Sequence, residues 1–175
     1  TVTDEAGFRA KIQEEVESMF KQDAERKLSN DIYEELLKKF PLELPDEFLR
    51  RWLKATNEKL TDEELAEGYD DFAKNLKWTL IENKIIKDNS IEIKYEDVVQ
   101  AAKAKLDAQF RMYSPSPLPE DQLAQYAVQF LQEKENANRT FEEVKALKTF
   151  EQIKSVVTLE QKEIDYDKFT ELAKA

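Results

Sequence analysis

Carboxylates are the only abundant groups in this sequence that could carry out acid–base chemistry. The 175 residues include 38 Asp and Glu, but no His and no Cys. Without those two residue types there can be no Ser-His or Cys-His nucleophile, no zinc bound by imidazole or thiolate, and no disulfide. A glycosidase-like pair of carboxylates would have to converge across a cleft, and nothing in the spacing selects one pair. We therefore expect no catalytic residue, no enzyme activity and no cofactor.

The acidic residues also lack the patterns of a metal site. A calcium loop needs a glycine at its sixth position among regularly spaced acids, and neither Gly7 nor Gly68 has that context. A carboxylate-bridged di-metal bundle normally uses Glu-x-x-His. Because only 2 residues are glycine, phosphate-binding glycine loops and hairpin-rich β folds are disfavoured as well. The prediction is that the chain binds no metal.

Charge and hydropathy restrict the partners. A net charge of −11 argues against binding to nucleic acid, which requires a basic face. No stretch approaches the roughly 20 apolar residues that span a bilayer, so we expect no membrane segment. Residues 1–20 lack the basic and apolar regions of a signal peptide, which predicts a cytoplasmic protein. The sequence begins with Thr rather than Met, which suggests a trimmed protein or an excised domain.

Helical periodicity dominates the sequence and predicts an all-α fold. The length predicts a single domain over residues 1–175. A long helical segment is expected over residues 1–40, where apolar residues recur every four positions from Phe8 to Phe40. Because a helix turns about 100° per residue, each step of four drifts by about 40°. The segment must therefore bend or break, or pack its two ends against different elements.

Further helices are expected at 46–59, 62–87, 96–112, 119–135, 141–158 and 166–174. Thr61 and Thr140 are each followed by Glu three residues later, which fits a capping box at the start of a helix. Trp52 and Trp78 lie on apolar helix faces and are predicted to be core residues. Short extended links that alternate apolar and acidic residues precede three of the helices, at 42–44, 91–93 and 163–165. Either these links form a corner between helices that recurs in the fold, or unrelated links have converged on the same residue pattern.

A helical hairpin is predicted over residues 95–135, with its tip near 113–119. The segment Ser114-Pro115-Ser116-Pro117 cannot be helical, and large apolar side chains flank it. Such side chains have little core to enter near a hairpin tip, and aromatic residues with a flexible Met suit loosely specific apolar contacts. The alternative is that they pack the hairpin against itself. The candidate binding residues are Phe110, Met112, Tyr113, Leu118, Leu123, Tyr126, Phe130 and Leu131.

Three stretches of the sequence together resemble the C-terminal, client-binding domain of trigger factor, the bacterial ribosome-associated chaperone. The first is the amphipathic opening that leads into Leu44-Pro45-Asp46-Glu47-Phe48-Leu49-Arg50-Arg51. The second is Leu80-Ile81-Glu82-Asn83-Lys84-Ile85-Ile86-Lys87 with the Ile91-Glu92-Ile93 link. The third runs from Asn136-Ala137-Asn138-Arg139 to the Ile164-Asp165-Tyr166 link. The resemblance covers essentially the whole chain.

The resemblance implies an elongated all-α body with protruding helical arms, which cradles unfolded or nascent polypeptides without ATP. It also implies that this sequence is a fragment of a longer protein. The family's ribosome-docking and prolyl-isomerase domains are not in this sequence, so the ribosome would be reached only through those missing domains. The proline-rich segment from Ser114 to Pro119 departs from the family's arm turn.

The sequence is also compatible with two alternatives to a trigger-factor-like chaperone. Related helical links occur in the periplasmic chaperone SurA, which would need a signal sequence upstream. A helical adaptor that binds one folded partner is the other alternative. A chaperone should bind many unrelated unfolded segments with similar weak affinity, whereas an adaptor should prefer one partner. Formation of a homodimer through apolar helix faces left over from the fold is also left open.

Overall fold

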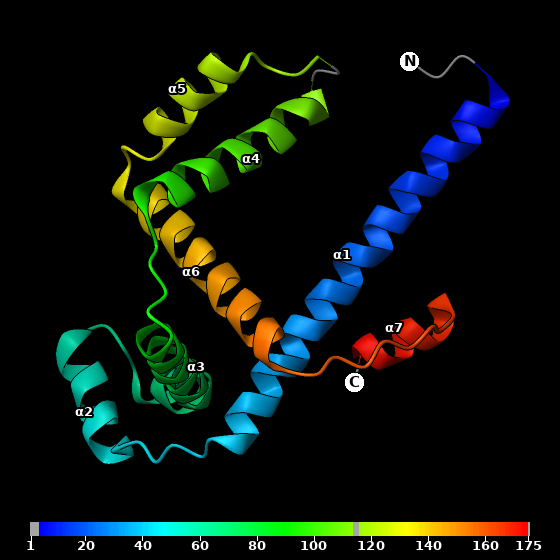
Figure 1. Cartoon of the computed structure of the whole chain (residues 1–175). Coiled ribbons are helices and arrows are strands. Elements are labelled where there is room, and N and C mark those ends of the chain that lie inside the picture. Colours follow the sequence, from blue (N-terminus) through cyan, green and yellow to red (C-terminus); the bar gives the residue numbers. More distant parts are fainter. Residues whose placement is uncertain (1–3, 114–115, 175) are drawn as a thin grey trace. The chain divides into compact units, whose positions relative to one another are not determined.

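The computed structural model describes residues 4–113 and 116–174. The described residues form seven α-helices and contain no β-strand (Figure 1). The helices are α1 (Glu5–Lys39), α2 (Asp46–Thr56), α3 (Asp62–Asp88), α4 (Tyr95–Tyr113), α5 (Glu120–Phe130), α6 (Lys134–Val156) and α7 (Tyr166–Lys174). The all-α fold predicted from helical periodicity is confirmed. Ser114 and Pro115 of the predicted hairpin tip lie outside the described residues.

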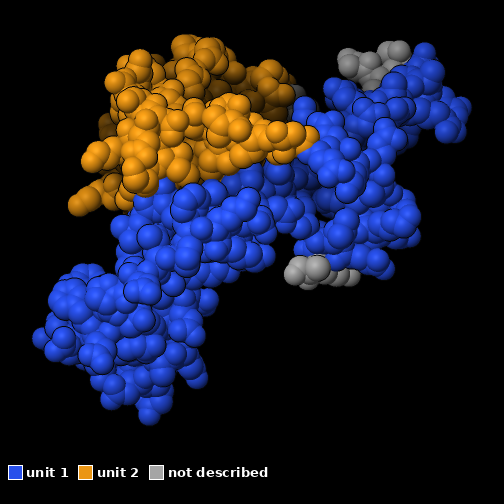
Figure 2. Space-filling model, turned by 60° about the horizontal axis from the view of Figure 1, so that its bottom comes forward, with its two compact units in different colours: residues 1–81, 160–175 blue, residues 82–159 orange. Residues whose placement is uncertain are grey.

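The chain divides into two compact units, which are coloured separately in Figure 2. Unit 1 comprises residues 1–81 and 160–175, and unit 2 comprises residues 82–159. Helix α3 contributes to both units, because the boundary falls between Ile81 and Glu82. Helices α1, α2 and α7 belong to unit 1, and α4, α5 and α6 belong to unit 2. That all of them form one client-binding domain stays a prediction.

Helix α1 runs unbroken for 35 residues although none of its residues is buried. Its first turn is capped by Asp4, whose carboxylate accepts a hydrogen bond from the Gly7 N–H at 2.7 Å. Towards its C-terminus, the Tyr33 ring lies 4.9 Å from the ring of Trp78 in α3. Earlier in the helix, Phe20 packs against Tyr166 of α7. The middle and the C-terminal part of α1 therefore contact different elements, whereas Phe8 and Ile12 near its N-terminus remain exposed.

Helices α2 and α3 of unit 1 are joined by a short turn whose capping box was predicted correctly. The Thr61 N–H donates to the Glu64 carboxylate at 2.9 Å, and the Glu64 N–H donates to Thr61 Oγ1 at 3.2 Å. This reciprocal pair satisfies two backbone donors that the first turn of α3 leaves free. In the next turns of α3, Leu65 and Tyr69 are buried. They provide the buried apolar contacts of unit 1 near α2.

The prediction that Trp52 is a core residue is wrong. Its side chain is 47% exposed, and Phe48, one turn earlier on α2, is 55% exposed. The half-buried apolar residues of α2 are instead Leu49 and Leu53. These two pairs lie on adjacent faces of one helix, and α2 turns the leucine face inward. Trp78 is half-buried against Tyr33.

The core of unit 2 lies where α4, α5 and α6 meet. Its buried residues are Val98 and Ala102 of α4, Ala127 of α5 and Leu131 directly after α5. The two alanines have no exposed surface, and their small side chains allow the helices to approach closely. Around this cluster pack half-buried apolar residues, including Leu106 and Phe130. The core thus sets the spacing of the α4–α5 hairpin.

Two helix boundaries in unit 2 differ from the predicted ones. The predicted helix 119–135 ends at Phe130, and the helix predicted to begin at 141 already begins at Lys134. Thr140 is therefore an interior residue of α6, and the prediction that it caps a helix is wrong. The residues from Lys134 to Arg139 include good helix formers and extend α6 upstream. Thr140 then enters the core, with 0% of its surface exposed.

Replacing Thr140 with valine should stabilise the protein. The Thr140 hydroxyl is buried and makes no hydrogen bond, and a buried unsatisfied polar group costs about 1–3 kcal/mol. Valine has the same shape without the hydroxyl, so we expect a gain of about 1 kcal/mol in the free energy of unfolding. Chemical denaturation monitored by circular dichroism measures it.

Thr149→Val is the matched control for this substitution. Thr149 is equally buried, but its hydroxyl donates to the Lys145 carbonyl at 2.9 Å. This variant should show no gain. A Thr140→Val protein less stable than the wild type would contradict the assignment of an unsatisfied hydroxyl.

Candidate functional site

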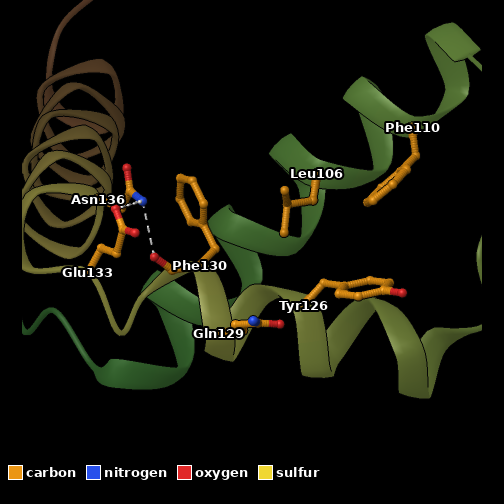
Figure 3. Close-up of a pocket in the computed structure, with 7 residues that line it drawn as sticks. All are labelled: Leu106, Phe110, Tyr126, Gln129, Phe130, Glu133 and Asn136. Atoms are coloured by element: carbon orange, nitrogen blue, oxygen red, sulfur yellow. Dashed lines mark hydrogen bonds between the residues drawn. The ribbon is translucent and has the colours of Figure 1, made fainter.

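A shallow groove between α4 and α5 collects aromatic side chains on the surface of unit 2 (Figure 3). Its volume is about 290 Å³. Four of the side chains around it are large and apolar, and three are polar. The lining residues are Leu106, Phe110, Tyr126, Gln129, Phe130, Glu133 and Asn136. The groove therefore combines apolar walls with a small polar region.

Helical spacing places the apolar walls of the groove. Leu106 and Phe110 lie four residues apart on α4, and Tyr126 and Phe130 lie four residues apart on α5, so each pair shares one helix face. The Phe110 and Tyr126 rings approach each other across the groove, with centroids 5.8 Å apart and planes tilted by 35° (Figure 3). Their side chains remain 36% and 44% exposed. Both rings are thus held in place and still accessible.

The polar region of the groove is built around the end of α5. The Asn136 side-chain amide donates to the Phe130 carbonyl at 3.3 Å and to the Glu133 carboxylate at 3.4 Å. The first of these bonds satisfies a carbonyl that the last turn of α5 leaves without a helical partner. Gln129 adds an amide that can both donate and accept hydrogen bonds. A bound polypeptide would meet hydrogen-bonding groups at one end of the groove and aromatic rings along it.

The structure brings three of the eight predicted binding residues, Phe110, Tyr126 and Phe130, together in this groove. Met112 and Tyr113, at the end of α4, are 82% and 85% exposed. The remaining three residues lie deeper. Leu118 is half-buried in the link before α5, whereas Leu123 and Leu131 are buried, with 6% and 8% exposed surface. The two buried leucines support the hairpin from its core and present little surface to a partner.

Sequence reasoning missed four residues of the groove. Leu106 carried a usable signal, because it precedes Phe110 by one helical turn. Gln129 lies next to Phe130 on a helix that was predicted. Glu133 and Asn136 carried no local signal, because they enter the groove only as a result of the break between α5 and α6 at residues 131–133.

A second open groove lies elsewhere on unit 2. Its volume is about 350 Å³, and two of its side chains, Tyr95 and Phe141, are 61% and 40% exposed. Leu131 and Val98 form its floor, since both are buried and both line it. Unit 2 therefore offers accessible aromatic surface at two separate places.

Hydrogen bonds shift the pKa values of five ionisable groups among the described residues. Hydrogen bonds lower the pKa values of Glu64, Asp97 and Asp165, and hydrogen bonds raise those of Lys11 and Lys74. A general acid or base working near pH 7 needs a shift in the opposite direction. These five shifts favour the charged forms and so stabilise helix ends and ion pairs.

Metal-binding clusters and membrane-spanning helices are both absent from the residues that the structure describes. Within residues 4–113 and 116–174, no three His, Cys, Asp or Glu side chains are grouped so that they could hold a metal ion. Across the same residues, every helix is too short or too polar to span a lipid bilayer. What the described surface does offer is apolar side chains in open grooves.

An all-α chain with accessible apolar grooves is typical of a domain that binds other polypeptides. A family model described as probable trigger factor, C-terminal domain, matches residues 11–173. The chain therefore belongs to the trigger factor C-terminal domain family. Comparisons with curated proteins and with solved structures give no match. Trigger factor C-terminal domains are chaperone domains rather than catalytic ones, so the family gives this chain a chaperone role and polypeptide clients.

Proposed function

We propose that this domain holds unfolded or nascent polypeptides, without ATP, on several separate apolar patches, and that the α4–α5 groove is one of them. The observation that carries the proposal is the pair of accessible rings, Phe110 and Tyr126, fixed 5.8 Å apart at an open groove. The likeness to trigger factor supports a cytoplasmic location as part of the same proposal.

The size of the groove suits short client segments. A volume of about 290 Å³ lies at the lower limit of small-molecule pockets, which hold roughly 300–1,000 Å³. It accommodates one or two apolar side chains of a client rather than a large ligand. Because the groove is open, the client backbone can pass through without threading. The groove does not select a particular client sequence, and a chaperone that binds many different polypeptides requires this low selectivity.

The binding energy is expected to be small at each patch and larger for the whole domain. A micromolar to millimolar contact corresponds to roughly 4–8 kcal/mol. When one client touches several patches, the second contact becomes intramolecular and the avidity rises by effective concentration. The net charge of −11 keeps a complex with exposed apolar surface in solution. Weak individual contacts also allow the client to leave and fold.

The test compares variants of the groove and of the neighbouring helix end. Phe110→Ser and Tyr126→Ser should each weaken binding of a permanently unfolded polypeptide about fivefold, because each removes roughly 1 kcal/mol of apolar contact. Met112→Ser and Tyr113→Ser should act in the same direction at less risk to the fold, since both side chains are more than four-fifths exposed. Fluorescence anisotropy of a labelled, unfolded polypeptide measures the affinity.

Leu147→Ser is the matched control for these variants. Leu147 is an exposed apolar residue of α6, 57% accessible, that lines neither groove. Its replacement should leave the affinity unchanged. If the four variants of the groove and the helix end bind the polypeptide as tightly as the wild type and Leu147→Ser do, the proposed site is wrong. Binding of one folded protein, with no binding of unfolded polypeptides, would favour an adaptor instead.

A further inference from the structure

A row of exposed apolar side chains follows the first half of α1 in unit 1. Phe8, Ile12, Val16 and Phe20 are spaced by four residues, and their exposed fractions range from 38% to 56%. Residues spaced by four form one of the two kinds of ridge by which helices pack against each other. A ridge of this kind whose side chains are all exposed can pack into the grooves of another helix.

The last helix of the chain already lies at one end of this ridge. The Tyr166 ring of α7 lies 5.5 Å from the Phe20 ring, and the two planes are tilted by 34°. Upstream of Phe20, the side chains of Phe8 and Ile12 stay 56% and 45% exposed. The position of α7 therefore shows which kind of segment fits the ridge, and most of the ridge is still open.

Helix α7 is short, amphipathic and well capped. Its apolar residues Tyr166, Phe169 and Leu172 are spaced by three. The Asp165 carboxylate accepts a hydrogen bond from the Lys168 N–H at 2.9 Å, which caps the first turn. A helix of nine residues is marginal in water by itself, so α7 depends on the surface it contacts. Leu172 and Tyr166 nevertheless remain 54% and 56% exposed, which indicates a weak contact.

We propose that the ridge from Phe8 to Phe20 is a docking surface for amphipathic client helices that carry aromatic and aliphatic residues three positions apart, and that α7 is a tethered occupant that competes with them. The inference rests on the proposed function, because it names a class of client for a second surface of the same domain. The α4–α5 groove takes extended apolar segments, whereas the ridge takes segments that have formed a helix.

The competition has an expected size. Because α7 and the ridge belong to the same chain and the same unit, α7 meets the ridge at an effective concentration that we take as millimolar, the usual range for tethered partners. If α7 binds the ridge with a dissociation constant between about 0.1 and 1 mM, it occupies the end of the ridge near Phe20 for about half to nine-tenths of the time. The apparent affinity of a competing helix equals its intrinsic affinity multiplied by the fraction of time in which α7 leaves the ridge free. Opening the contact should therefore raise that affinity about twofold to tenfold.

The experiment uses the full chain and a fluorescent peptide with the sequence of residues 163–174. Tyr166→Ser in the chain should make the peptide bind about twofold to tenfold more tightly than it binds the wild type. Phe20→Ser should weaken peptide binding about fivefold or more in both backgrounds, because it removes roughly 1 kcal/mol of apolar contact. Phe48→Ser is the matched control, because Phe48 is also an exposed phenylalanine, on α2, with 55% exposed surface against 42% for Phe20, and its replacement should leave the peptide affinity unchanged. A scrambled peptide with its apolar residues on all sides should bind at least fivefold more weakly.

Each contrary result overturns the inference. Equal affinity of the wild type and Tyr166→Ser would show that α7 does not compete, and a peptide affinity that Phe20→Ser leaves unchanged would show that the ridge is not the docking surface. A dimer that Phe20→Ser dissociates in sedimentation would show that a second copy covers the ridge instead. Phe110→Ser separates the two proposals, because it should weaken binding of unfolded polypeptides and leave the helical peptide unaffected.

Discussion

Lys145→Ala is expected to lower the free energy of unfolding of unit 2 by about 3 kcal/mol, because it leaves a buried carboxylate without its partner. The Lys145 ammonium lies 2.8 Å from the Glu82 carboxylate and 3.2 Å from that of Glu142. The side chains of Lys145 and Glu82 are only 10% and 6% exposed, whereas Glu142 is 64% exposed. The pair ties the end of α3 to the middle of α6.

The charge state of Lys145 follows from two opposing effects. Burial acts to lower the pKa of Lys145, but the hydrogen bonds to Glu82 and Glu142 outweigh it, so the pKa is raised above its ordinary value. The ammonium is therefore charged in the folded protein at neutral pH. Its removal leaves the buried Glu82 carboxylate without its ionic partner, which costs stability.

Two further variants make this prediction decisive. Replacing both Lys145 and Glu82 with leucine should bring stability back to within about 1 kcal/mol of the wild type, because a buried ion pair is worth little more than apolar side chains of similar volume. Lys84→Ala, which removes an exposed pair with Asp88 at 2.5 Å, should cost less than about 1 kcal/mol. Urea denaturation followed by circular dichroism measures all three. A loss below 1 kcal/mol for Lys145→Ala would refute the burial argument.

Tyr69→Ala should destabilise unit 1 by about 3–5 kcal/mol, the usual cost of truncating a buried aromatic residue. Tyr69 is 3% exposed and joins α2 to α3. Its hydroxyl donates to the Asp46 carboxylate at 2.6 Å, and the Arg50 guanidinium lies 3.6 Å above its ring. Tyr69→Phe keeps the ring and loses the hydroxyl, so it should cost about 1–2 kcal/mol.

The same residue predicts how unit 1 responds to alkaline pH. Burial, with help from the hydrogen bond to Asp46, raises the pKa of Tyr69 from 10.0 to about 12. A raised pKa contributes stability that is complete below pH 10 and is lost as the pH rises towards 12. Unfolding monitored by tryptophan fluorescence reports on this unit, because Trp52 and Trp78 both lie in it. Tyr69→Phe should show a smaller loss of stability across this window, and an identical loss in both proteins would contradict the assignment.

The sequence predicts those parts of the fold that depend on local chemistry. Helical periodicity alone leads to an all-α structure, and the Thr61 capping box forms as predicted. The same pattern at Thr140 fails, because whether a helix begins there depends on whether the residues upstream are helical. Trp52 fails for a related reason. Helix α2 has two adjacent apolar faces, and only its packing in unit 1 decides which one turns inward.

The candidate site shows the same division between local and distant causes. Phe110 and Tyr126 could be predicted as accessible residues, because they lie on two helices joined by a segment that cannot be helical. That Leu131 is buried could not, since its burial follows from its packing with Ala102 and Ala127 in the core where α4 meets α5. Glu133 and Asn136 depend on where α5 ends, a boundary that no residue pattern marks.

The central claim is that the domain holds unrelated unfolded polypeptides on the same apolar residues. An NMR titration of the isotope-labelled domain with two unrelated unfolded polypeptides tests it most directly. We expect both to shift the same resonances, above all those of Phe110, Met112, Tyr113 and Tyr126, while the buried Ala102 stays in place. If neither polypeptide shifts these resonances and a single folded protein binds tightly instead, the chaperone account of this surface is wrong and the domain is an adaptor.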